Sequence, residues 1–302
     1  MKYFLLTSRG LTASTWLSKT INELEKVFVS HGRDYPKRSQ ENLKVLLKDE
    51  NYRESRIDYE WLEQRDINIV DFLKKNLDDQ LINKLNCIGN VHGYKLEEAI
   101  SKISNNSEKI EIIGNMIRSP FGFIASYINL IYQNYMIFPE KFFAENISRI
   151  EQNKEFLYYL KNNEYQLIDT IFIEACYACL SSAKDLNIRN YKQIRMEDLT
   201  SSSFYLKDFL HQICFKYNLD ESNIDEIVEN NQLKTNINTH QNAHEVFNYK
   251  SIKEQFKIDI KDFSKWPNYW KDFCIDFFDN DFRNYLQYYE NDPLLEFFEK
   301  TK

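Results

Sequence analysis

The sequence predicts an α/β protein in which a parallel β-sheet is covered by helices on both faces, with additional helical segments. Short apolar runs, typical of buried strands, alternate with helical patterns in the first part of the chain. All six glycines lie within the first 122 residues, where tight turns between strands and helices need them. Because 302 residues can bury one large core, we expect a single domain with helical insertions around 33–85 and 134–190.

The amino-terminal part predicts a strand, a helix and a second strand. The apolar run YFLL within 2–7 has the length of a buried strand. Over 14–26 the apolar residues recur every three or four positions, which is typical of a helix with one buried side. The run VFV at 27–29 predicts a short strand that ends at His31. The charged stretch that follows predicts loops and helices, including one helix over 68–76.

Further strands and helices alternate in the same way. A strand is expected at 87–91, followed by an amphipathic helix over 94–104. KIEIIGNMI at 109–117 is the clearest strand pattern, and Pro120 favours a helix over 121–133 directly after it. Helical patterns then run over about 140–161 and 164–187, a strand is expected at 191–195, and further helices begin near Ser203.

Four side chains directly follow expected strands. These are Arg9, His31, His92 and Arg118. In parallel sheets the ligand sits beyond the carboxyl ends of the strands. We therefore expect these four residues along one rim of the sheet, in a ligand-binding position.

Charge and composition exclude several classes of function. The net charge of -7 and the pI near 5.4 argue against a nucleic-acid partner, whose binding surface would be basic. No apolar run approaches the roughly 20 residues that span a bilayer, and the first residues do not form a signal-peptide pattern. Five cysteines at irregular spacing fit a reducing compartment. We expect a soluble, cytoplasmic protein.

The first candidate motif is the loop SRGLTAST at residues 8–15. A strand, a loop of small and hydroxyl residues and a helix start can bind phosphate through backbone N–H groups and hydroxyls. Thr12, Ser14 and Thr15 supply three hydroxyls, and Arg9 supplies a cation. The alternative is an ordinary helix start capped by Thr12 or Ser14. The signature GxxxxGK(S/T) is absent, which disfavours a Walker-type kinase.

The second candidate motif is NMIRSPFGFIASY at residues 115–127. Arg118 ends the strand, and Ser126 lies about two helical turns into the following helix. Both side chains suit one phosphate near the start of that helix. The alternative is a surface arginine and a buried serine without a ligand.

In this order, the two motifs resemble those of the sulfotransferases that use 3′-phosphoadenosine-5′-phosphosulfate (PAPS). The family's first loop, written PKSGTTWL or PRSGSTWL, is similar to LTASTWL at residues 11–17. Its second motif, RNPxDxxxSY, is similar to residues 118–127, with the same spacing from Arg118 to Ser126. The family sequence YEDL is matched by MEDL at 196–199, and WKDF at 270–273 weakly resembles the family's terminal WKxxF region. The resemblance implies a P-loop-like parallel fold.

The resemblance also implies how the donor is bound. The first loop would hold the 5′-phosphosulfate, and Trp16 would stack on the adenine unless it is a core residue. Arg118 and Ser126 would bind the 3′-phosphate. The implied donor-binding residues are Arg9, Thr12, Ala13, Ser14, Thr15, Trp16, Arg118 and Ser126.

A general base and a cation complete the implied catalytic site. Many family members have a histidine after the third strand, where this chain has His92. Its imidazole would accept the proton of the attacking hydroxyl, with His31 or a carboxylate as alternatives. The family's loop lysine is Leu11 here, and its lysine two positions before the histidine is Asn90. We expect Arg9 to replace the missing loop charge.

The expected function is therefore sulfuryl transfer from PAPS to a hydroxyl or amine of a small-molecule or glycan acceptor, without a metal. Two alternatives stay open: a kinase-like transferase that uses a nucleotide, and a sulfotransferase-like binding protein without catalysis. The acceptor and the oligomeric state, monomer or homodimer, are not specified by the sequence.

Overall fold

The computed structural model describes residues 1–10, 12–32, 69–74, 77–104, 106, 109–137, 156–231 and 249–302. The chain divides into two compact units, each built from two separate stretches of sequence. Unit 1 comprises Met1–Ile117 and Asn190–Ala243, and unit 2 comprises Arg118–Arg189 and His244–Lys302. That the 302 residues form one domain stays a prediction.

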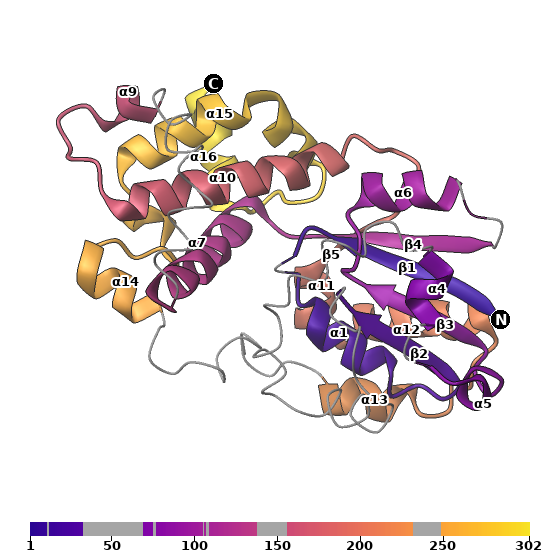
Figure 1. The fold of residues 1–302 in the computed structure, drawn as a ribbon. Helices are drawn as coiled ribbons and strands as arrows, with labels where there is room; N and C mark the ends of the chain where they lie inside the picture. Colours follow the sequence, from indigo (N-terminus) through magenta and orange to yellow (C-terminus); the bar gives the residue numbers. More distant parts are fainter. Residues whose placement is uncertain are drawn as a thin grey trace. The chain divides into compact units, whose positions relative to one another are not determined.

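Unit 1 is built on a five-stranded sheet in which all paired strands are parallel (Figure 1). The strands lie in the order β2-β3-β1-β4-β5. Each forms where the sequence predicted a strand, which confirms the α/β class and the parallel sheet. The strands are β1 (Lys2–Ser8), β2 (Val27–His31), β3 (Cys87–Val91), β4 (Ile110–Ile117) and β5 (Gln193–Arg195).

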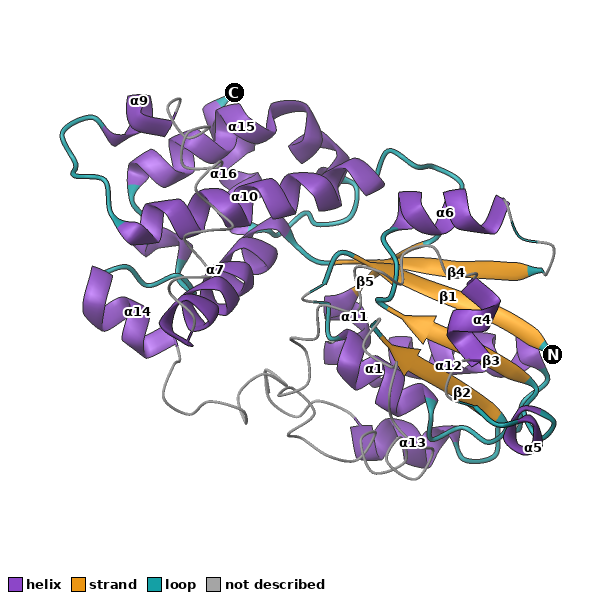
Figure 2. Ribbon diagram, viewed as in Figure 1, coloured by secondary structure: helices purple, strands orange, loops and turns teal. Residues whose placement is uncertain are grey.

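Helices cover both faces of this sheet, so unit 1 has three layers (Figure 2). The side chains of β1 alternate between the faces: Phe4 and Leu6 belong to one buried cluster, and Tyr3 and Leu5 to another. The first face is covered by α1 (Ser14–Ile21), α11 (Met196–Ser201), α12 (Ser203–Tyr217) and α13 (Ile224–Asn231), and the second by α4 (Ile69–Lys74) and α6 (Leu96–Ser104), while α5 (Asp79–Ile82) precedes β3.

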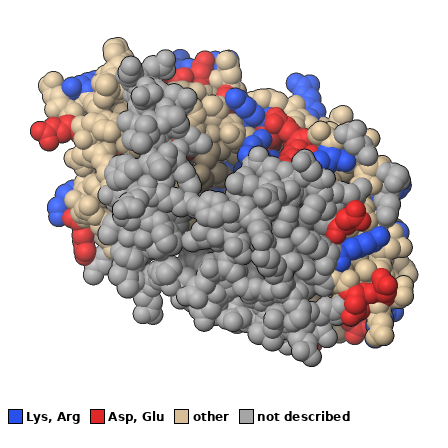
Figure 3. Space-filling view, viewed as in Figure 1, with Lys and Arg blue, Asp and Glu red and all other residues tan. Residues whose placement is uncertain are grey.

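Both signs of charge occur among the described residues on the face that Figure 3 shows. On the face in Figure 3, Lys and Arg side chains lie among Asp and Glu side chains. Ion pairs such as Lys207 with Asp225 are exposed, and each contributes only about 0–1 kcal/mol. Among the described helices, none combines the length and the apolar composition that crossing a bilayer requires.

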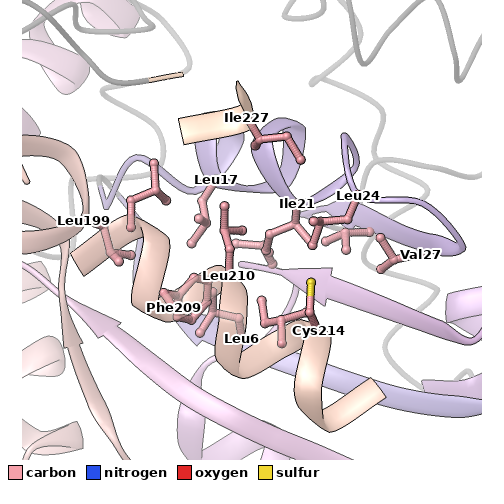
Figure 4. Close-up of a cluster of buried hydrophobic side chains, with 14 of the residues drawn as sticks. Leu6, Leu17, Ile21, Leu24, Val27, Leu199, Phe209, Leu210, Cys214 and Ile227 are labelled. Atoms are coloured by element: carbon pink, nitrogen blue, oxygen red, sulfur yellow. The ribbon is translucent and has the colours of Figure 1, made fainter. Parts of the chain in front are cut away.

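The core beneath α1 fixes the start of this helix against the sheet. Leu17 and Ile21 of α1 pack with Leu210 and Cys214 of α12 and with Leu6 of β1 (Figure 4). Both α1 side chains are fully buried. Burial of one such side chain stabilises the fold by roughly 1.5–3 kcal/mol. The loop that leads into α1 is therefore attached to a rigid element at its carboxyl-terminal side.

Unit 2 is helical in its described residues. Its core is aromatic, and Phe172 stacks on Trp270 with ring centroids 4.2 Å apart. Beside them, Oδ1 of the buried Asp169 accepts hydrogen bonds from Trp270 Nε1 at 2.7 Å and from the Tyr269 hydroxyl at 3.1 Å. The elements are α7 (Pro120–Ile137), α9 (Leu157–Leu160), α10 (Leu167–Asp185), α14 (Tyr249–Phe256), the 3₁₀ turn η4 (Phe263–Lys265), α15 (Asn268–Leu286) and α16 (Pro293–Thr301).

Helix α1 ends at Ile21, earlier than the predicted range 14–26. The cause is Asn22, whose Nδ2 donates to the Val29 carbonyl at 2.7 Å and whose Oδ1 accepts from Val29 N at 2.8 Å. These two bonds turn the chain back towards β2. Lys26 completes the turn with a left-handed φ of 61°.

The expected helical insertions are described only in part. Residues 33–68 and 138–155 lie outside the described residues. In the described remainder of 33–85 and 134–190, α4, α5, α9 and α10 are helical.

Candidate functional site

The carboxyl ends of β1, β2 and β3 lie at one edge of the sheet of unit 1. The chain leaves β1 through α1 on one face, and it leaves β3 through α6 on the other face. Such a divergence between neighbouring strands is where open α/β sheets bind ligands. Arg9, His31 and His92 lie at these three strand ends, as predicted. Arg118 directly follows β4 in the sequence and belongs to unit 2.

The loop between β1 and α1 folds around a pair of hydroxyls. Ser8 Oγ lies 2.6 Å from Thr12 Oγ1 and accepts a hydrogen bond from Gly10 N at 2.9 Å. Ala13 is the N-cap of α1, with a left-handed φ of 53°, and its methyl group accepts no hydrogen bond from the helix N–H groups. Capping by Thr12 or Ser14, the alternative to an anion-binding loop, is therefore wrong.

His31 ends β2 and reaches the first turn of α1. Its Nε2 lies 3.0 Å from Ser14 Oγ and 3.2 Å from Thr15 Oγ1. The histidine is 4% exposed. Two of the three hydroxyls predicted to hold phosphate are thus in contact with a buried imidazole, a contact that the sequence reasoning did not foresee.

His92 follows β3 and lies against the first loop. Its Nδ1 is 3.2 Å from the Ser8 carbonyl oxygen. A carbonyl oxygen only accepts, so Nδ1 carries the hydrogen and, in the neutral ring, Nε2 carries the lone pair. The ring centroid is 5.6 Å from that of His31. An imidazole with this tautomer, half-buried beside the loop, has the chemistry of a general base.

Gly10 allows the close approach between the loop and His92. A Cβ atom on Gly10 would lie 3.2 Å from His92 Cε1. The glycine also has a φ of 96°, a backbone conformation that L side chains rarely adopt. The backbone conformation therefore favours glycine here, and any larger residue would also force the His92 ring to move by a few tenths of an ångström.

Asn90 holds the ends of β2 and β3 together. Its Nδ2 donates to Ser30 Oγ at 2.8 Å and to the Gly32 carbonyl at 2.9 Å. Its Oδ1 accepts from Gly93 N at 2.6 Å. The residue is 1% exposed. Where the resembled family has a lysine, this chain has an amide that binds the Ser30 side chain before His31, the Gly32 backbone after His31 and the backbone directly after His92.

Arg9 lies at the start of the same loop. Its Nη2 is 3.8 Å from Glu97 Oε2 of α6, and the exposed fractions of the two side chains are 11% and 63%. An ion pair with one exposed partner contributes about 0–1 kcal/mol. An anion with two or more charges would therefore compete with Glu97 for the guanidinium, and the role of Arg9 as the loop cation stays a prediction.

Trp16 is a core residue in this structure. It is 6% exposed and belongs to the cluster beneath α1. Its indole N–H donates to the Asn231 carbonyl of α13 at 2.9 Å. The structure therefore favours the core interpretation of Trp16 over adenine stacking.

In unit 2, the start of α7 contacts a carboxylate that the sequence reasoning missed. Asp292 Oδ2 accepts from Phe121 N at 3.0 Å, while Oδ1 accepts from Leu294 N and Leu295 N as the N-cap of α16. The signal was available, because an aspartate before a proline and an apolar run is typical of a helix start.

Arg118 and Ser126, the two residues predicted to bind the 3′-phosphate, lie near the start of α7. Arg118 is half-buried before α7, and Ser126 is 7% exposed within it. Lys261 also carries its charge near Arg118: the pKa of Lys261 is lowered by burial and, to a smaller extent, by the arginine. The sequence reasoning missed Lys261 as a second cation beside Arg118, because Lys261 belongs to no recognised motif.

Asp292 makes stability depend on pH. Burial raises the pKa of Asp292 from 3.8 to about 6, although its hydrogen bonds act in the opposite direction. Because the folded pKa is the higher one, the stabilising contribution is complete below about pH 4 and is lost as the pH rises through 6. The loss is about 3 kcal/mol, from 1.36 kcal/mol per pKa unit.

We expect this pH dependence to disappear in Asp292→Asn, which keeps an N-cap oxygen but does not titrate. Urea unfolding of both proteins at several pH values between 4 and 7 measures the difference in their free energies of unfolding. That difference should change by about 3 kcal/mol in favour of the variant as the pH rises. A constant difference would contradict the assignment.

Comparison with protein-family models, with curated proteins and with solved structures finds no match to this chain.

Proposed function

We propose that this chain transfers a sulfuryl group from PAPS to a hydroxyl or an amine. The observation that carries the proposal is the position of His92, whose Nδ1 lies 3.2 Å from the Ser8 carbonyl and whose ring lies against Gly10. Because no side chain caps α1, its first N–H groups can bind an anion. A base with a defined tautomer beside this loop can then assist transfer of a group that the anion carries. The motif resemblance identifies that anion as a phosphosulfate.

In the proposed reaction, the first loop binds the 5′-phosphosulfate. Backbone N–H groups at the start of α1 and the Ser14 and Thr15 hydroxyls donate to its oxygens. The acceptor oxygen attacks sulfur as its proton moves to His92 Nε2. The bond between sulfur and the bridging oxygen breaks, and this oxygen leaves on adenosine 3′,5′-bisphosphate. Arg9 stabilises the charge that develops there.

The remaining parts of the proposal rest on the resemblance alone. By this resemblance, Arg118 and Ser126 bind the 3′-phosphate, which distinguishes PAPS from other adenine nucleotides. The five-stranded sheet is of the P-loop-like kind. The acceptor is a small molecule or a glycan.

Thermal unfolding with added nucleotide tests the donor. We expect adenosine 3′,5′-bisphosphate at 100 times its dissociation constant to stabilise the protein by about 2.7 kcal/mol, which raises Tm by several degrees. ADP, which lacks the 3′-phosphate, should give a much smaller shift. Arg118→Ala should abolish the difference between the two nucleotides. Equal protection of the wild type by ADP would contradict the proposal.

Turnover tests separate the proposed function from its two alternatives. Transfer of labelled sulfate from PAPS to phenols or glycans supports the sulfotransferase. Tight bisphosphate binding without transfer to any acceptor would indicate a binding protein that has lost catalysis. Phosphate transfer from ATP with magnesium would indicate the kinase-like alternative.

A further inference from the structure

The first loop has no lysine, but a buried histidine stands behind its hydroxyls. His31 Nε2 lies within hydrogen-bonding distance of both Ser14 Oγ and Thr15 Oγ1, at 3.0 and 3.2 Å. These hydroxyls lie on the first turn of α1, whose N-cap is an alanine. The ring nitrogen of His31 therefore determines where the hydrogens of the Ser14 and Thr15 hydroxyls point.

We propose that His31 is a positioning residue of the donor site, which directs the Ser14 and Thr15 hydroxyls towards the 5′-phosphosulfate. The inference rests on the proposed function and assigns to His31 a role other than the base. Its ring donates the Nε2 hydrogen, shared between the two oxygens, and thereby leaves both hydroxyl hydrogens for the anion.

The number of hydroxyl hydrogens decides which form of His31 favours anion binding. Each hydroxyl has one hydrogen and can donate it to one acceptor only. If Nε2 accepted from the hydroxyls, their hydrogens would point at the ring and their lone pairs would face the phosphate oxygens, which repels the anion. If Nε2 carries a hydrogen and donates, both hydroxyls donate to the anion. Binding of the anion and the donating form of His31 therefore favour each other.

The chain is held on both sides of His31, before it through the Ser30 side chain and after it through the Gly32 backbone, which is what a positioning role requires. The residue before it, Ser30, and the residue after it, Gly32, both accept hydrogen bonds from Asn90 Nδ2. Gly32 N also donates to the Val91 carbonyl at 2.9 Å. The end of β2, which carries the His31 ring, is thus bonded to the neighbouring strand β3.

Strand alternation explains why the ring faces α1. Val27 and Val29 of β2 belong to the cluster beneath α1, and His31 is the next residue of the same parity. The signal was therefore present in the sequence. It was not used, because the relation between β2 and the start of α1 depends on the order of the strands in the sheet.

Two variants and two ligands test the role. His31→Leu fills the buried volume without a donor, and His31→Gln retains a side-chain N–H of similar reach. The ligands are adenosine 3′,5′-bisphosphate and adenosine 3′-monophosphate, which lacks the 5′ group. We expect His31→Leu to weaken binding of the bisphosphate by roughly ten- to hundredfold, the value of hydrogen bonds to a charged group. Binding of the 3′-monophosphate should change by less than about twofold, and His31→Gln should recover most of the lost affinity.

A double-mutant comparison identifies the hydroxyls as the intermediaries. Ser14→Ala with Thr15→Val should weaken bisphosphate binding to a similar extent, and adding His31→Leu to this pair should cost little more. If His31→Leu does not fold, His31→Met, which also lacks a donor, takes its place in the same comparison. Losses that add fully would overturn the proposal.

The outcomes separate this inference from the proposed function. If the wild type binds the bisphosphate and His31→Leu binds it equally well, or loses both ligands to the same extent, the positioning role is wrong while the proposed function stands. If the wild type does not bind the bisphosphate, the proposed function and this inference fall together.

Discussion

Replacement of His92 by asparagine is expected to lower kcat of sulfuryl transfer by about 10²- to 10⁴-fold, the contribution of a positioned general base. Affinity for adenosine 3′,5′-bisphosphate should change by less than about twofold, because the proton transfer occurs only in the reaction. Asparagine suits the site, since His92 has a φ of 68° and asparagine tolerates this left-handed region. Its Nδ2 can still donate to the Ser8 carbonyl, whereas the base at Nε2 is lost.

Transfer from labelled PAPS under single-turnover conditions measures this change. His211→Asn is the matched control: His211 is exposed on α12, pairs with Glu221, and should tolerate the change without loss of activity. If His92→Asn kept full turnover, His92 Nε2 would not be the general base. The base would then have to be His31 or a carboxylate.

Replacement of Asp169 by alanine is expected to lower the free energy of unfolding by about 4 kcal/mol, since each hydrogen bond to a charged group contributes roughly 1.5–3 kcal/mol. The carboxylate is fully buried and accepts from Trp270 Nε1, the Tyr269 hydroxyl and Gln166 N. The last bond belongs to the capping box of α10. Alanine would leave the indole N–H of Trp270 buried without its acceptor.

Urea unfolding followed by tryptophan fluorescence measures this loss. Asp169→Asn should cost less, because its Oδ1 still accepts from Trp270 and Tyr269 while only the Gln166 bond is lost. Glu290→Ala, at an exposed position of unit 2, should change stability by less than about 0.5 kcal/mol. A loss in Asp169→Ala as small as that of the control would contradict this account of the core.

Most strands were predictable because they contain short apolar runs between polar residues, whereas β5 (QIR) has a single apolar residue. β3 matches its predicted range and β4 differs from 109–117 by one residue. The end of α1 was not predictable from periodicity, because the Asn22 side chain bonds to β2 and overrides it. The order of the strands was also not predictable, because β1 pairs with β3 and β4, which lie far along the chain.

The site was predictable in its residue types but not in its contacts. Strand ends predicted four residues along one rim: Arg9, His31, His92 and Arg118. The structure places the first three at the ends of β1, β2 and β3, whereas Arg118 follows β4 as the first residue of unit 2. The contact of His31 with Ser14 and Thr15 depends on which strand lies beneath α1. Similarly, Asp169 is buried because Trp270 donates to it from another helix, and no local pattern records a partner so distant in sequence.

The interleaved course of the chain has a consequence for biosynthesis. The chain leaves unit 1 after Ile117, returns at Asn190 and leaves again after Ala243. β1 to β4 therefore emerge from the ribosome before α12 and α13, which fill the core on one face of their sheet. At roughly 5–20 residues per second this face stays uncovered for several seconds to about twenty seconds. We expect unit 1 to complete its fold only after α13 has left the ribosome, and this face of the sheet should need protection by chaperones until then.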